Sequence, residues 1–308
     1  MNTTRGPVST TSRAGTVAEP GTGQARALRA ARLQRRLATG VLLLGAVYCL
    51  LPVVWVLLAA TKTRTELFST FTLSPGLHGG LWQNIRDLSQ YRHGEFWQWA
   101  ANSLLYAGVG SVLSVLVSAM AGYALAKYRF PGRDLLFATV LCAVLLPQVA
   151  LAIPQYLFLA RIGLAGSYWS VLLPGLLSPY GIYLMRVYAS AAVPDEMLEA
   201  ARVDGARELR IFRSIALPTL VPGLVTAFLL QFVASWNNFL LPYVVLSDDR
   251  KYPMTVGLFT LLNQGANQPA LYSLVVTGSL LAVLPLIVLF LFLQRFWSID
   301  LVSGTVKV

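Results

Sequence analysis

Six stretches of this 308-residue chain contain no Asp, Glu, Lys or Arg. A helix needs roughly 20 apolar residues to cross the hydrocarbon core of a bilayer, and each stretch is long enough. Only 12% of the residues are charged, about half of the roughly 25% found in soluble domains. We therefore predict an all-α integral membrane protein with six transmembrane helices, near residues 38–60, 101–126, 135–159, 166–185, 219–246 and 272–294.

The positions of the basic residues predict the orientation of these helices. With six crossings, both termini share one side of the membrane with the loops 127–134 and 186–218. That side holds 17 of the 24 Lys and Arg residues, so the positive-inside rule places both termini in the cytoplasm. The net charge of +11 is thereby explained by topology. We expect no nucleic-acid partner, because no basic stripe is interleaved with stacking aromatic residues.

The chain divides by composition into two parts. Residues 1–36 are rich in Thr, Gly, Ala and Arg without apolar periodicity, and are predicted to form a flexible, basic cytoplasmic tail. Residues 37–308 form the transmembrane domain. Cys49 and Cys142 lie inside apolar runs, which favours buried hydrophobic side chains over a disulfide.

One line of small residues predicts close helix packing. Gly110, Ser114, Ser118, Gly122 and Ala126 recur every four residues along the second predicted span. Such a line lets another helix approach closely, as is typical of helix association in lipid. The sequence leaves open whether that helix belongs to this chain or to another.

Prolines recur in and beside the spans. Each removes a backbone donor and leaves a carbonyl to be satisfied within the bundle. They fit either kinked helices around a path or the general tolerance of membrane helices for proline. The positions are Pro52, Pro147, Pro154, Pro174, Pro179, Pro222, Pro242 and Pro285.

The loop at about 190–218 is predicted to be a helix–turn–helix outside the bilayer. Pro194 suits the first helical position, and Asp195 and Glu196 then lie in the first turn, where the helix dipole favours negative charge. Gly205 suits the left-handed residue that ends this helix. A second helix follows, marked by Leu209, Phe212 and Ile215 and closed by Pro218.

The composition of this loop favours a protein partner. Five acidic and five basic residues are interleaved across 186–213, with Ala200 and Ala201 at the centre. A short helix carrying small residues can enter a cleft of another protein, and its charges can fix the orientation. The alternative is an amphipathic helix lying on lipid headgroups, but such helices are usually basic and carry bulky anchors.

The residues of this loop resemble a known family. Glu199-Ala200-Ala201, then Asp204-Gly205-Ala206, and then Phe212, Ile215 and Leu217-Pro218 are similar to the EAA loop of type I ABC importer permeases. The resemblance extends from about residue 37 to the C-terminus and is closest to the carbohydrate-uptake branch, the "G"-type inner-membrane subunit of maltose permeases. Further similar segments are residues 62–68, 128–132, 235–239 and 304–307.

This resemblance implies a membrane-spanning subunit of an ATP-driven, binding-protein-dependent importer for a sugar or oligosaccharide, in a prokaryotic plasma (inner) membrane. The implied partners are a second homologous permease in a heterodimer, two ATP-binding subunits, an extracytoplasmic solute-binding protein and membrane lipid. It also implies that Glu199 contacts the ATPase and that Gly205 forms the turn. The full set of expected ATPase-coupling residues is Glu199, Ala200, Ala201, Asp204, Gly205 and Ala206.

The chain is not expected to be an enzyme. It contains no Gly-Lys dipeptide, so a Walker A loop is absent, and ATP and Mg²⁺ are expected on the partner ATPase. His78 and His93 lie apart from any cluster with metal-ligand spacing, and no metal is expected. Trp236, Asn237 and Asn238 are predicted to line the substrate path.

Three alternatives remain open at this level. An ion-coupled secondary carrier generally needs ionisable residues within the membrane, which the six charge-free cores lack. A non-transport scaffold or channel subunit is the second. Within the importer class, a permease for amino acids or phosphonates is the alternative to a sugar permease.

Overall fold

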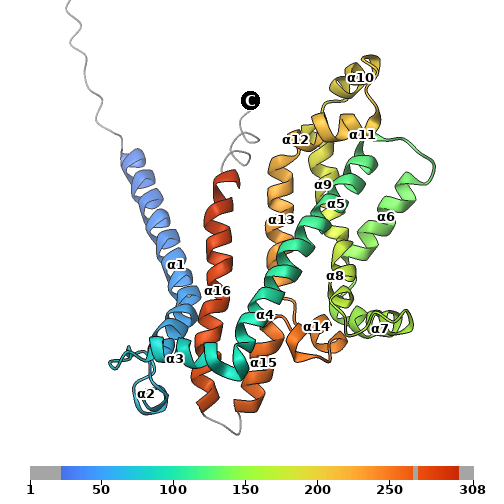
Figure 1. The fold of residues 1–308 in the computed structure, drawn as a ribbon. Coiled ribbons are helices and arrows are strands. Elements are labelled where there is room, and N and C mark those ends of the chain that lie inside the picture. Colours follow the sequence, from blue (N-terminus) through green and yellow to red (C-terminus); the bar gives the residue numbers. More distant parts are fainter. Residues whose placement is uncertain (1–21, 266–269, 298–308) are drawn as a thin grey trace, which may run out of the picture. The chain divides into compact units, whose positions relative to one another are not determined.

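The computed structural model describes residues 22–265 and 270–297, so most of the expected tail and the 304–307 segment lie outside the described residues. The described residues contain helices and no strand, which confirms the all-helical prediction (Figure 1). The chain divides into two units, one ending at Val54 and the other beginning at Trp55. The helices are α1 Thr22–Ala60, α2 Arg64–Ser69, α3 Gly80–Gln90, α4 Glu95–Leu104, α5 Gly110–Lys127, α6 Arg133–Val144, α7 Gln148–Arg161, α8 Trp169–Leu176, α9 Pro179–Ala192, α10 Asp195–Val203, α11 Glu208–Ile211, α12 Leu217–Thr219, α13 Val221–Trp236, α14 Leu240–Val245, α15 Met254–Gly265 and α16 Ala270–Trp297.

Helix α1 begins earlier than predicted. It starts at Thr22 rather than near residue 38, so residues 22–36 of the expected flexible tail are helical. These residues are mostly Ala, Arg, Leu and Gln, all of which have high helix propensity. Propensity therefore extends the helix beyond its apolar part.

The two cysteines lie on the surface of the chain. Cys49 in α1 and Cys142 in α6 are free and exposed, so the predicted burial is wrong. A membrane helix turns apolar side chains toward lipid as readily as toward its own core, and apolar surroundings in the sequence therefore do not establish burial.

Three helical segments are long and apolar enough to cross a membrane: Gln34–Ala60, Glu95–Lys127 and Leu271–Gln294. Two bent pairs raise the number to as many as five if each pair is one span. Helices α6 and α7 meet at 107°, and the segment Glu208–Thr219 meets α13 at 77°. The six-span count and the location of the termini stay predictions.

The span predicted at 166–185 is divided into α8 and α9. The residue before a proline avoids helical backbone angles, and Ser178, just before Pro179, is extended at φ −104° and ψ 102°. The Ser178 side chain then accepts a hydrogen bond from the Gly181 N–H and caps the new helix. The Ser178-Pro179 pair therefore explains why the helix breaks between α8 and α9.

Helices α5, α9 and α13 lie side by side (Figure 1), and α9 is the partner of the small-residue line. A Cβ added at Gly122 would lie 2.6 Å from the Arg186 backbone nitrogen, and one at Gly181 would lie 2.6 Å from the Ser118 Oγ. Real Cβ atoms do not approach so closely, so both glycines are needed for this contact. The small-residue line therefore packs within this chain.

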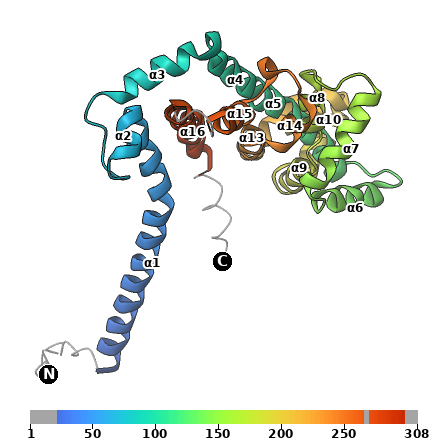
Figure 2. The ribbon, with the colours of Figure 1, turned by 90° about the horizontal axis from the view of Figure 1, so that it is seen from below.

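A second group of helices packs on the other side of α13. Helices α4, α15 and α16 lie together in both views (Figures 1 and 2). Their shared core contains Phe96, Trp99, Trp236, Leu261 and Leu274. This core holds the α4 end of the long α4–α5 helix beside α13.

Candidate functional site

The predicted helix–turn–helix is present at one end of the α5–α9–α13 group (Figure 1). Helix α10 begins at Asp195, one residue later than predicted, with Pro194 as the residue before the helix. Gly205 has φ +77°, the left-handed conformation expected at the turn. The segment from Pro194 to Thr219, here called the α10–α12 segment, continues into α13.

One face of the α10–α12 segment is part of the main core. Leu198 is 2% exposed and Ile211 is 1% exposed. They belong to one apolar cluster with Tyr123 of α5, Met185 of α9 and Val193. Because dense packing transmits displacement, a force on α10 acts directly on α5 and α9.

Polar contacts join the same segment to the end of α5. Lys127, whose side chain is 6% exposed, places its Nζ 2.7 Å from the Asp195 Oδ1. The Tyr128 hydroxyl donates to the Glu208 Oε2 at 2.8 Å, and the Arg202 Nε donates to the Glu208 Oε1 at 2.8 Å. The hydrogen bond from Lys127 and its charge lower the pKa of the Asp195 carboxyl. Asp195 is therefore ionised, and paired, at neutral pH.

The expected ATPase-coupling residues divide between two environments. Glu199, Ala200, Asp204 and Gly205 are exposed, so they are available to a partner. The other two, Ala201 and Ala206, are half-buried and pack against the apolar cluster. Contact of this set with an ATPase stays a prediction.

Two large apolar side chains also face outward, which sequence reasoning missed. Val203 is 87% exposed, and Leu209, one of the three residues that marked the second helix in the sequence, is 77% exposed. A π-helical turn over Phe212–Ala216 widens the helix, so the buried positions are Ile211, Ala216 and Leu220. Leu209 lies two residues before the buried Ile211, about 200° around the helix, and therefore faces away from the core.

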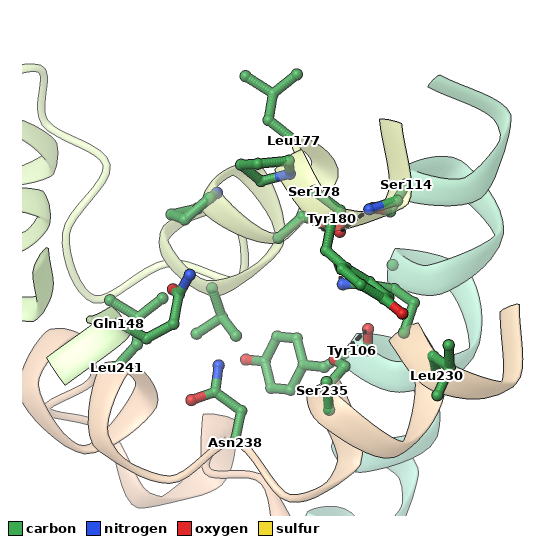
Figure 3. Close-up of a pocket in the computed structure, with 18 of the residues that line it drawn as sticks. Tyr106, Ser114, Gln148, Leu177, Ser178, Tyr180, Leu230, Ser235, Asn238 and Leu241 are labelled. Carbon is green, nitrogen blue, oxygen red and sulfur yellow. Dashed lines mark hydrogen bonds between the residues drawn. The ribbon is translucent and has the colours of Figure 1, made fainter. Parts of the chain in front are cut away.

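A second candidate site is a cavity of about 520 Å³ lined by residues of α5, α6, α7, α8, α9, α13 and α14. In Figure 3, Gln148 and Asn238 lie on one side of this space and Tyr180 and Ser114 on the other, with Tyr106 between. The described side chains that line it are all uncharged. Its polar members are Tyr106, Ser114, Ser118, Gln148, Gln155, Ser178, Tyr180, Gln231, Ser235, Asn237 and Asn238.

The three residues predicted to line the path do not share one environment. Asn237 and Asn238, in the break after α13, line the cavity. Trp236 does not: it is 4% exposed, stacks on Phe232, and its indole Nε1–H donates to the Ala282 carbonyl at 3.1 Å. Its ring is therefore packed in the core between α13 and α16.

Most of the cavity residues carried no signal in the sequence. Tyr106 lies in a π-helical turn over Leu105–Val109, and Gln148 begins α7 after the sharp bend that follows α6. Only Pro147 and the Ser178-Pro179 pair marked the breaks that bring these walls together. Pro147 and Pro179 thus lie at helix breaks around the cavity, whereas Pro52, Pro154, Pro174 and Pro285 lie inside continuous helices.

Residues 114–298 match the family described as the inner membrane component of binding-protein-dependent transport systems. The chain belongs to this family. The permease is 38% identical over 214 residues to the arabinooligosaccharide transport permease of Halalkalibacterium halodurans, covering 70% of this chain and 75% of the relative. It is 31% identical over 271 residues to the sn-glycerol-3-phosphate transport permease of Pectobacterium atrosepticum, covering 86% of this chain and 94% of the relative.

The fold of the permease is also shared with a solved structure. A chain of a bacterial ABC transporter for import of the acidic polysaccharide alginate aligns with a TM-score of 0.76 at 22% identity, over 87% of this chain and 97% of that chain. The permease is thus a multi-pass component of a membrane transport system, with the fold of an ABC importer subunit.

Proposed function

We propose that the permease forms one half of the translocation path of an ATP-driven importer for a sugar or oligosaccharide. The other half is a second, homologous permease. Two ATP-binding subunits hold the ATP and Mg²⁺ and perform hydrolysis, and an extracytoplasmic binding protein delivers the solute. This chain itself is not catalytic.

The observation that carries the proposal is the two-sided character of α10. Its outer face presents Glu199 and Ala200, while Leu198 on its inner face is 2% exposed and packed against α5 and α9. A partner that grips the outer face therefore moves the helices beneath it. When the two ATP-binding subunits close, their movement is proposed to be transmitted through α10 to the helices that form the translocation path.

The relatives support the substrate class, since one of them is named for arabinooligosaccharides. The proposed setting is a prokaryotic plasma membrane, with both termini and the α10–α12 segment in the cytoplasm. That orientation brings α10 to the compartment that contains ATP. The excess of Lys and Arg on this side supports it.

The test is gentle detergent extraction of a tagged chain from native membranes, with mass spectrometry of the proteins that accompany it. We expect an ATPase and a second permease. In membrane vesicles, uptake should require ATP and stop with vanadate. A chain that is recovered alone, or uptake driven by an ion gradient without ATP, would contradict the proposal.

A further inference from the structure

The connection that follows the first membrane-crossing segment is folded around an inward-facing lysine. Lysine side chains near the ends of membrane helices generally extend toward the lipid headgroups. Lys62 is instead only 1% exposed, and its Nζ donates to the Phe71 carbonyl at 2.7 Å and to the Thr72 carbonyl at 3.4 Å. Its ammonium group therefore holds residues 62–72 in a closed loop.

A carboxylate fixes the next part of this connection. Glu66, whose side chain is 12% exposed, accepts hydrogen bonds from the Thr63 N–H at 2.9 Å and from the Leu77 N–H at 3.2 Å, and it pairs with the His78 Nδ1 at 2.5 Å. The bond from the Thr63 N–H, followed by that from His78, lowers the pKa of the Glu66 carboxyl to about 2. Residues 61–90, here called the α2–α3 segment, therefore keep these contacts at physiological pH.

Two helical segments that are apolar and long enough to cross a membrane fix the depth of the α2–α3 segment. One of them, Gln34–Ala60, ends where the α2–α3 segment begins, and Asn84 of α3 donates to the Ala60 carbonyl at 3.1 Å. The other, Leu271–Gln294, begins beside α3, because Leu88 of α3 and Leu271 belong to one apolar cluster. The α2–α3 segment therefore lies at the level where these helices leave the bilayer.

Large aromatic side chains project from the α2–α3 segment. Trp82 is 78% exposed and Phe71 is 74% exposed, and Phe68 is 62% exposed although its ring meets that of Tyr272 edge-on at 6.0 Å. Exposed apolar groups gathered in this way mark an interaction surface. Tryptophan in particular is enriched where a bilayer meets water, because its ring is apolar and its N–H is polar.

The residues around Trp82 favour lipid as the surface that covers it. Arg86 is exposed one helical turn after Trp82, on the same face of α3, whereas Asn84 and Leu88 are buried on another face. A guanidinium binds phosphate groups through charge-assisted hydrogen bonds. Helix α3 thus carries an aromatic anchor beside a phosphate-binding cation, the combination that holds membrane proteins at the lipid headgroups.

We propose that the α2–α3 segment lies in the headgroup layer of the bilayer, with Phe71 and Trp82 inserted toward the acyl chains. Lys62 is the residue that holds the loop carrying Phe71 in this position. The partner is a lipid surface, and the proposal does not depend on the importer function.

The test places one fluorophore at a time on the full chain, reconstituted with the subunits that accompany it. Cys49 and Cys142 are replaced by alanine, and Phe71→Cys or Trp82→Cys is labelled with a nitrobenzoxadiazole fluorophore. The vesicles consist of phosphatidylcholine whose acyl chains carry bromine near the headgroup. We expect both labels to lose fluorescence relative to vesicles of the same lipid without bromine.

Two further positions calibrate the measurement. Leu42→Cys, at a position 72% exposed in α1, is the lipid reference, and Val203→Cys, at a position 87% exposed in α10, is the water reference. If aqueous iodide rather than brominated lipid quenches the labels at Phe71→Cys and Trp82→Cys, the segment stands in water and the proposal is overturned. If neither agent quenches them, a protein covers the surface, and the proposal is overturned as well.

The Lys62→Met variant tests the role given to the lysine. It leaves two carbonyls of the loop without their donor, so the label at Phe71→Cys should lose its quenching by brominated lipid while the label at Trp82→Cys keeps it. Arg64→Met is the matched control, because Arg64 is the neighbouring basic residue but its side chain is 54% exposed and pairs with Asp87. Unchanged quenching at Phe71→Cys in Lys62→Met, or an equal loss in the control, would show that Lys62 does not hold the loop.

Discussion

At the scale of single residues, the turn after α10 depends on Gly205. Its φ of +77° costs a side-chain-bearing residue on the order of 1–2 kcal/mol, and a Cβ there would meet open space. Strain of that size does not unfold a helical membrane domain but displaces the exposed face of α10. A substitution at Gly205 is therefore expected to disturb the contact of α10 with its partner and to leave the fold intact.

We expect Gly205→Val to insert normally and to lose most uptake. Gly163→Val is the matched control, because Gly163 has φ +74° and equally open surroundings but lies after α7. Uptake rates, normalised to the amount of protein in the membrane, measure the effect. If Gly205→Val takes up solute at the wild-type rate, the conformation of this turn is not required for coupling.

The Lys127–Asp195 pair predicts a pH dependence of α10. The pKa of Asp195 is lowered from its usual value of 3.8, first by the hydrogen bond from Lys127. The stabilisation is therefore fully present above 3.8 and is lost as pH falls through the lower folded-state value. Amide hydrogen exchange of residues 195–203 should be faster in Asp195→Asn than in wild type at pH 6, and this difference should vanish at sufficiently low pH.

Glu196→Gln controls for the charge of the first turn, because Glu196 lies beside Asp195 at the start of α10 and is also exposed. It should change exchange less than Asp195→Asn does. Equal effects of the two variants at pH 6 would show that the helix dipole, and not the pair with Lys127, stabilises this end of the helix.

At the scale of elements, the close approach of α5 and α9 depends on Gly122. A Cβ at this position would lie 2.6 Å from the Arg186 nitrogen and 2.7 Å from the Met185 Cβ. Backbone atoms cannot move aside as a flexible side chain can. The two helices must therefore separate to admit even one methyl group.

We expect Gly122→Ala to lower the stability by about 1–3 kcal/mol, as overpacking of a dense core generally does. Gly108→Ala, in the same long helical segment, should have little effect, since a Cβ there has nothing within 4 Å. Thermal unfolding in detergent distinguishes them. A Gly122→Ala protein as stable as wild type would mean that α5 and α9 do not approach this closely.

At the scale of the whole molecule, the orientation of the chain is a prediction from the distribution of Lys and Arg. It places Leu77 outside the cell and Val203 in the cytoplasm. Both side chains are strongly exposed, at 83% and 87%, so a cysteine at either position is accessible to a reagent.

The test replaces Cys49 and Cys142 by alanine and then introduces Leu77→Cys or Val203→Cys. A membrane-impermeant maleimide should label Leu77→Cys in intact cells, and Val203→Cys only after the cells are opened. Labelling of both from outside would contradict the odd number of crossings between these two positions.

The sequence by itself determined that this chain lies in a membrane, is helical, and carries a helix–turn–helix whose first helix ends at Gly205. Those features follow from local composition, spacing and backbone preference. Only the tertiary structure decided that α9 packs on the small-residue line, that Leu209 faces outward and Trp236 inward, and that Tyr106, Gln148 and Asn238 surround one cavity. Local patterns such as the Ser178-Pro179 pair mark where a helix breaks, but which distant segments then meet depends on packing across the whole chain.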